Sequence, residues 1–144
     1  AGLFPQMHQF LTSYWGGMLD LGCDTFWETY DPAQKGAEHY AMYGHPYGKS
    51  LCHAWGAGPI ILFGKYYLGV RPTAPGYETF LVEPHPNGLL QLKGEVPTPE
   101  GSILVEITPE KIIVDNRSAG HGTLRWKDES VAVAPHTVVA VERR

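Results

Sequence analysis

One acidic residue follows two large aromatic residues directly, in the segment 24–28 with the sequence DTFWE. Glycoside hydrolysis uses two carboxyl groups, one that protonates the leaving oxygen and one that activates water or attacks the sugar carbon. A pyranose also presents a flat C–H surface that stacks on tryptophan, so Glu28 beside Trp27 offers both kinds of group. Taken alone, this spacing favours a solvated loop glutamate next to a core tryptophan over a catalytic residue.

A second cluster lies at residues 50–59, with the sequence SLCHAWGAGP. His53 stands near an expected helix start, where it can hydrogen-bond a sugar hydroxyl, and Trp55 can form the wall of a pocket. The small residues at 56–58 allow another element to approach closely. By itself, a histidine at a helix start is more often a structural hydrogen-bonding residue than a catalytic one, so the local pattern again favours a structural role.

Other chemistries find little support in the chain. His8, His39 and His45 belong to no HExxH motif, EF-hand loop or tight His/Asp triplet, so we expect no metal site. A glycine-rich phosphate loop and a GxSxG nucleophile motif are also missing from the sequence, and we expect no cofactor. The spacing of Cys23 and Cys52 suggests neither zinc, haem nor a redox pair, which leaves a disulfide or, as the favoured interpretation, two buried thiols.

Composition limits the class of protein. The 144 residues are 43% hydrophobic and 18% charged, with a formal net charge of −4, which is typical of a globular chain. The mild acidity and scattered basic residues argue against a nucleic-acid partner. The most apolar stretch, residues 60–63, is far too short to span a membrane, and the N-terminal sequence lacks the pattern of a signal peptide. The sequence leaves the cellular compartment open.

The first half of the chain predicts helices separated by a long loop. A helix with an apolar face begins near Pro5 and weakens at Gly16-Gly17; that face consists of Met7, Phe10, Leu11, Tyr14 and Trp15. Residues 22–50 predict an irregular, functional loop, whose aromatic residues we expect to be buried. A second helix is expected over residues 51–68, capped by Ser50 and Gly69, with a kink or a later start near Pro59.

The chain changes character near residue 72, after which short β-branched runs alternate with Pro and Gly. About seven short strands in this half predict a compact antiparallel β-sandwich. The expected strands are residues 78–83, 89–96, 101–107, 111–116, 123–126, 131–133 and 137–141.

Together these features resemble the C-terminal end of bacterial α-L-rhamnosidases, inverting glycoside hydrolases with an (α/α)6-barrel catalytic domain. The resemblance covers nearly the whole chain and is specific because several short motifs occur in the same order. The matching segments are residues 24–28, 50–55, 58–59, 67–70, 72, 75–77 and 94–101.

The resemblance implies an α+β chain, with the terminal helices of an (α/α)6 barrel at residues 1–72 and a small antiparallel β-sandwich at residues 73–144. It implies that Glu28 is the general base and that His53 contacts the bound rhamnose. Trp27 and Trp55 flank these residues and are expected to line the pocket. Where the family often has small or hydroxylated residues, this chain has Cys23 and Asp24, which affects the expected substrate preference more than the reaction class.

In the resemblance, the general acid lies in barrel helices upstream of residue 1. The implied partners are therefore a rhamnose-containing glycoside and the remainder of the catalytic domain, and the isolated chain is expected to be inactive. Helix faces without that domain are expected to self-associate or to pack on the sandwich; the residues concerned are Phe10, Tyr14, Ile61 and Phe63. Two alternatives stay open: a non-catalytic carbohydrate-binding or structural module, and a helical-barrel hydrolase that acts on another sugar.

Overall fold

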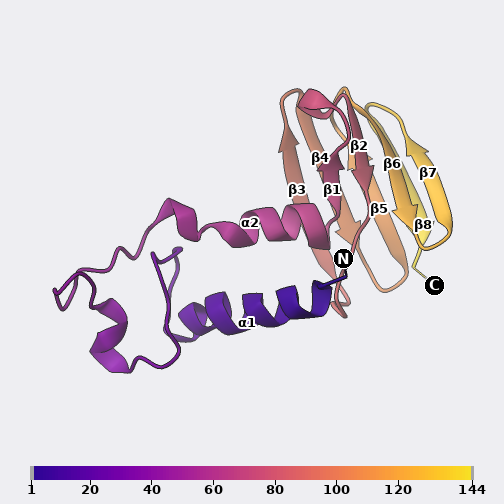
Figure 1. Cartoon of the computed structure of the whole chain (residues 1–144). Helices are drawn as coiled ribbons and strands as arrows, with labels where there is room; N and C mark the ends of the chain where they lie inside the picture. Colours follow the sequence, from indigo (N-terminus) through magenta and orange to yellow (C-terminus); the bar gives the residue numbers. More distant parts are fainter. Residues whose placement is uncertain (1, 144) are drawn as a thin grey trace. The chain divides into compact units, whose positions relative to one another are not determined.

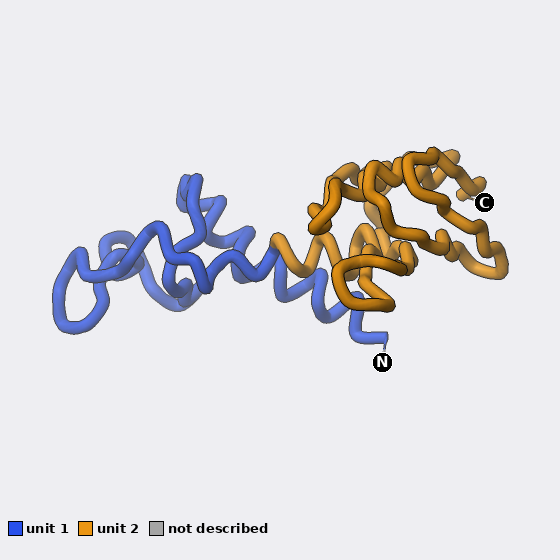
Figure 2. Tube along the Cα trace, turned by 90° about the horizontal axis from the view of Figure 1, so that it is seen from above, with its two compact units in different colours: residues 1–59 blue, residues 60–144 orange. Residues whose placement is uncertain are grey.

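The computed structural model describes residues 2–143 (Figure 1). They form two compact units, which divide in the sequence between Pro59 and Ile60 (Figure 2). This division precedes the change in composition near residue 72, because the helical residues after Pro59 and a short strand at residues 70–72 both belong to the second unit. The division into domains at residues 72 and 73 refers to the intact protein and stays a prediction.

The first unit opens with helix α1 (Phe4–Asp20), which has proline in its first turn as expected. The helix continues through Gly16-Gly17 instead of weakening there. At Gly17 a Cβ atom would lie 2.3 Å from the Tyr30 hydroxyl oxygen, so the absence of a side chain at Gly17 lets the Tyr30 ring pack closely on the helix. Along the predicted apolar face Leu11 is buried, whereas Phe10 stays 52% exposed.

The loop after α1 is irregular, as predicted. It contains two 3₁₀ turns, η1 (Gly36–Tyr40) and η2 (Ala54–Gly56). The expected burial of its aromatic residues is correct for Trp27, which is 4% exposed and packs on Tyr40 with ring centroids 5.8 Å apart. It is wrong for Tyr43 and Tyr47, which are 70% and 79% exposed.

The single helix expected over residues 51–68 is wrong, and the later start near Pro59 is correct. The α-helical part, α2 (Gly58–Leu62), has only five residues and leads into a π-helical turn, η3 (Phe63–Tyr67). Two glycines and a proline within four residues (Gly56, Gly58 and Pro59) prevent a regular helix before this point. Gly69 follows the last turn with a φ of +75°, the left-handed conformation expected of a residue that ends a helix.

The second unit contains eight strands in two four-stranded sheets, in the orders β1-β2-β6-β7 and β3-β4-β5-β8 (Figure 1). A 3₁₀ turn, η4 (Pro75–Tyr77), connects β1 to β2. The strands are β1 (Val70–Pro72), β2 (Thr79–Val82), β3 (Leu92–Thr98), β4 (Gly101–Ile107), β5 (Lys111–Asn116), β6 (His121–Trp126), β7 (Glu129–Val133) and β8 (Thr137–Glu142).

The sheets form the expected β-sandwich around one hydrophobic core. Among the described residues, the paired strands are antiparallel except β2 and β6, which run parallel. The core joins side chains of both sheets, among them Phe80 and Val82 from one and Ile103, Ile112 and Val114 from the other. The α+β class with a sandwich is therefore confirmed, whereas the (α/α)6 barrel stays a prediction.

A buried asparagine fixes the end of this sandwich. Asn116 donates from Nδ2 to the carbonyl oxygens of Gly120 (2.8 Å) and Ala134 (2.9 Å), and its Oδ1 accepts from the backbone and the hydroxyl of Ser118.

Within residues 2–143, no helix is long and apolar enough to cross a membrane.

Candidate functional site

Two loop segments of the first unit run side by side and join the two sequence clusters. The Glu28 N–H donates to the Ser50 carbonyl oxygen (2.9 Å), and the His53 N–H donates to that of Phe26 (2.7 Å). The Thr25 hydroxyl donates to the carbonyl oxygen of Leu51. These bonds bring together the predicted site residues Glu28, His53 and Trp55, although more than twenty residues separate the two segments in the sequence.

Close packing behind these segments fixes their path. Trp27 is buried beside Glu28, so its indole supports the segment instead of presenting an open face. A Cβ at Gly56 would lie 2.5 Å from the Trp27 carbonyl oxygen, which gives a reason for the small residue there. The Gly56 carbonyl oxygen in turn accepts a hydrogen bond from Trp15 Nε1 on α1 (2.8 Å).

The Glu28 carboxylate is held by two donors. Its Oε1 accepts from the Tyr43 hydroxyl, and its Oε2 accepts from the Ser50 N–H at 3.2 Å. The Tyr43 hydrogen bond lowers the pKa of Glu28 most and the Ser50 bond adds to this; burial opposes them, and electrostatic interactions with His53 and Lys49 lower the pKa further by less. Glu28 is therefore ionised at neutral pH.

His53 and Trp55 lie near Glu28: His53 interacts electrostatically with its carboxylate, and Trp55 contacts its backbone. Their ring centroids are 4.4 Å apart, and the rings are tilted by 42°. Trp55 Nε1 donates to the Glu28 carbonyl oxygen (3.1 Å), yet the residue is 71% exposed. The indole N–H of Trp55 is thus hydrogen-bonded to the backbone, while the aromatic surface of Trp55 stays accessible to a ligand.

The sequence did not predict the hydrogen bonds that Tyr43 and the Ser50 N–H donate to the Glu28 carboxylate, or the nearby position of Lys49. Lys49 is 7% exposed and donates to Gln34 Oε1 at 3.3 Å. Tyr43 lies 15 residues from Glu28 in an exposed turn, so no periodicity connects the two residues. The sequence indicated only a turn in this region, through Gly44 and Gly48, which follow Tyr43.

Over the described part of the chain, no group of three or more His, Cys, Asp or Glu residues is arranged to hold a metal ion. The thiols of Cys23 and Cys52 are free. The prediction of two buried thiols is wrong for Cys52, which is exposed, and Cys23 is partly buried. Burial, and then the charge of Asp24, raise the pKa of the Cys23 thiol.

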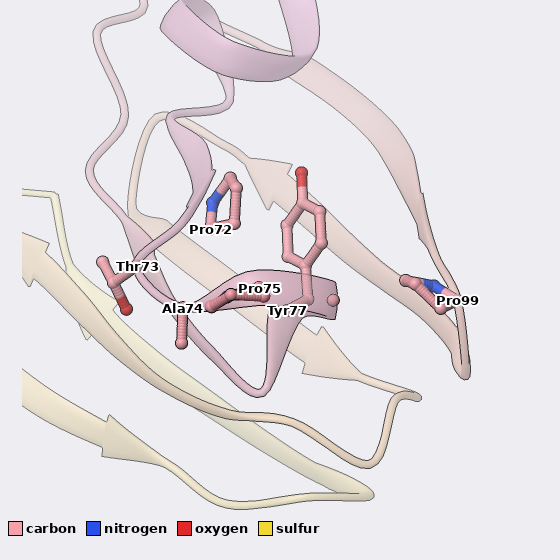
Figure 3. Close-up of a pocket in the computed structure, with 7 residues that line it drawn as sticks. Pro72, Thr73, Ala74, Pro75, Tyr77 and Pro99 are labelled. Carbon is pink, nitrogen blue, oxygen red and sulfur yellow. The ribbon is translucent and has the colours of Figure 1, made fainter.

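The sandwich has a separate open hollow of about 550 Å³ (Figure 3). Among its lining residues Tyr77 is the one that titrates, so the hollow offers no pair of carboxyl groups for hydrolysis. It is lined by Pro72, Thr73, Ala74, Pro75, Gly76, Tyr77 and Pro99.

Comparison with family models gives one match. Residues 69–114, about a third of the chain, match the family described as bacterial alpha-L-rhamnosidase C-terminal domain. The resemblance to bacterial α-L-rhamnosidases is thereby confirmed. No curated protein sequence matches the chain.

Solved structures of α-L-rhamnosidases share the fold. The enzyme from Aspergillus terreus superposes with a TM-score of 0.69 at 19% identity, over 90% of this chain and 16% of its own. The Streptomyces avermitilis enzyme, complexed with L-rhamnose, gives 0.64 at 16% identity, over 88% and 14%. The enzyme from Dictyoglumus thermophilum gives 0.53 at 21% identity, over 76% and 12%. The chain therefore spans about a sixth of the length of these proteins, or less.

Proposed function

We propose that this chain is the C-terminal part of an α-L-rhamnosidase, and that Glu28 is the general base that activates water for inverting hydrolysis of terminal α-L-rhamnosyl residues. The observation behind the proposal is a carboxylate kept ionised by Tyr43 and Ser50, beside His53 and the exposed Trp55. The family match and the shared fold support the glycosidase context.

The electrostatics favour the role of base over that of acid. An inverting glycosidase needs one carboxylic acid that stays protonated and one carboxylate that removes a proton from water. The hydrogen bonds of Tyr43 and Ser50 lower the pKa of Glu28, which suits the second role. Each carboxylate oxygen accepts one described hydrogen bond and has a further lone pair for the water proton.

Substrate binding is assigned to the side chains around this carboxylate. The open face of Trp55 is suited to the C–H surface of a sugar, and His53 to one of its hydroxyl groups. Trp27 lies beside Glu28 but is buried, so we assign it the lining of the pocket from behind.

The general acid would come from the upstream part of the catalytic domain, because inversion places it about 6.5–9.5 Å from the base, across the scissile bond. The isolated chain would therefore hydrolyse no rhamnoside at an appreciable rate. Apolar side chains that the upstream domain would cover are exposed here: Phe10 by 52%, Ile61 by 66% and Phe63 by 39%. Such exposure supports self-association of the isolated chain.

The test is the substitution Glu28→Gln in the intact enzyme. The amide keeps the size of the side chain but cannot accept a proton, so kcat should fall about 10²- to 10⁴-fold, the range of general-base catalysis, with little change in KM. The matched control is Asp20→Asn, an exposed carboxylate at the end of α1. Unchanged turnover of the Glu28→Gln enzyme would refute the role of the base.

One observation favours a non-catalytic carbohydrate-binding module instead, namely the hollow on the sandwich that contains Tyr77. Against it, Phe80 lies in the core, and Tyr77 and Trp126 pack against that core instead of forming an exposed aromatic platform. Screening the intact enzyme with several aryl glycosides would separate a rhamnosidase from a hydrolase of another sugar.

A further inference from the structure

We propose that Tyr43 is a positioning residue, whose hydroxyl orients the Glu28 carboxylate toward the attacking water; this inference rests on the proposed function. Tyr43 contacts the base and is not assigned a contact with the sugar. Tyr43 belongs to the same site as Glu28 but lies on a different segment, residues 42–48.

The backbone of this segment presents Tyr43 at the tip of a tight turn. Met42 and His45 exchange two backbone hydrogen bonds, of 3.0 and 2.9 Å, which close the turn around Tyr43 and Gly44. Tyr43 has a φ of +53°, in the left-handed region that a side chain with a Cβ disfavours. A Cβ at Gly48 would lie 2.3 Å from the Met42 carbonyl oxygen, so the chain must also pass close behind the turn.

Hydrophobic burial does not explain this conformation. The Tyr43 side chain is 70% exposed, so it gains little from packing. Its described interaction is the hydrogen bond from its hydroxyl to Glu28 Oε1. An unfavourable backbone conformation that places one polar atom on a carboxylate is typical of a residue kept for a functional contact.

Two donors from separate segments fix the carboxylate, where one alone would leave it free to rotate. The Ser50 N–H holds Oε2 and is itself fixed, because Ser50 and Glu28 are paired through the backbone. Tyr43 holds the other oxygen and so fixes the plane of the carboxylate. Of the described titratable groups, Tyr43, His53 and Lys49 act on Glu28, and only the first is in hydrogen-bond contact through its side chain.

Tyr43 acts as a donor and not as a second base. The hydrogen bond to Glu28, together with burial and the negative charge of Glu28, raises the pKa of the Tyr43 phenol. The hydroxyl is therefore protonated throughout the neutral range. Loss of the hydroxyl removes the largest influence that lowers the pKa of Glu28, so the acid limb of the rate profile should move to higher pH.

The experiment is Tyr43→Phe in the intact enzyme, with Tyr47→Phe as the matched control. Tyr47 lies on the same loop, is 79% exposed and makes no described contact with Glu28. For Tyr43→Phe we expect kcat to fall about tenfold, the lower end for a lost hydrogen bond to a charged group, with KM unchanged and the acid limb of kcat shifted to higher pH. The Tyr47→Phe enzyme should match the parent.

A second readout follows Glu28 itself. In the 144-residue chain with ¹³C-labelled glutamate, NMR titration should show that Tyr43→Phe raises the pKa of Glu28 and that Tyr47→Phe does not. If Tyr43→Phe matches Tyr47→Phe in both readouts while Glu28→Gln is inactive, the positioning role is wrong and the proposed function stands. If Glu28→Gln retains turnover, both proposals fail.

Discussion

Each unit of the molecule holds a glutamate whose pKa is lowered, but by different means. In the sandwich, Glu83 lies between Arg71 on β1 and Arg125 on β6, and both guanidinium groups form ion pairs with it. In the loop unit, Glu28 is held by a neutral hydroxyl and a backbone N–H. The charge of Glu83 is therefore balanced by direct ion pairs, whereas Glu28 remains a negatively charged acceptor in a partly open site.

The two glutamates also differ in the packing and exposure of the residues around them. Glu83 follows a strand whose residues Phe80 and Val82 are buried in the core of the sandwich. Glu28 lies on a loop near exposed aromatic residues, such as Trp55 and Tyr43. A lowered pKa alone therefore does not identify a catalytic residue. The kind of donor that lowers the pKa, and the exposure of the neighbouring side chains, distinguish the proposed base Glu28 from Glu83.

The largest expected effect on stability lies in the sandwich. Ile112 on β5 is fully buried, whereas its neighbour Ile113 points to the other face and is only partly buried. We expect Ile112→Ala to lower the free energy of unfolding by about 3–4 kcal/mol, because it leaves a cavity in the core. The Ile113→Ala control should lose clearly less. Urea denaturation measures both, and equal losses would contradict the described alternation of β5.

A smaller effect is expected at Glu83. Replacing it with glutamine removes two partly exposed ion pairs, so the free energy of unfolding should fall by about 1 kcal/mol at neutral pH, with kcat of the intact enzyme unchanged. Glu28→Gln should give the opposite pattern, with lost turnover and little change in stability. A Glu83→Gln enzyme that loses turnover would remove the distinction between the two glutamates.

The smallest expected effect is the pH dependence of the stability that the Glu83 ion pairs contribute. Burial raises the pKa of Glu83, but the hydrogen bonds and charges of Arg71 and Arg125 outweigh it, so the folded pKa lies below the ordinary value of 4.5. A depressed folded pKa gives stability that is present above the unfolded pKa and is lost as pH falls through the folded pKa. Urea titrations of the parent and of Glu83→Gln should therefore differ at neutral pH and converge well below pH 4.5. A difference that persists at low pH would argue against an ionic origin.

The sequence predicted the sandwich well where alternation was strong. The limits of β4 and β5 agree with the predicted strands at residues 101–107 and 111–116, because their apolar residues alternate and short turns separate them. Strand β1 was missed, since it has only three residues, ends in Pro72 and exists through pairing with β2. The parallel pairing of β2 with β6 was likewise not predicted, because it joins strands far apart in the sequence.

The site was predictable only in part, for a similar reason. Spacing alone gave Glu28 and His53 as two separate local patterns, and the family resemblance suggested that they act together. The backbone pairing of residues 26–28 with residues 50–53 is a non-local contact that neither pattern contains. Tyr43 left still less trace, because an exposed tyrosine in a glycine-rich turn is common and its partner is 15 residues away.

The most direct test of the account is chemical rescue of Glu28→Ala in the intact enzyme. If Glu28 activates water, the variant should lose turnover of an aryl rhamnoside, because no base remains to remove the proton. Added azide, a nucleophile that needs no deprotonation, should restore turnover and form a rhamnosyl azide of inverted configuration. Full activity of Glu28→Ala without azide would contradict the account, as would an inactive variant that azide does not restore while rhamnose binding is intact.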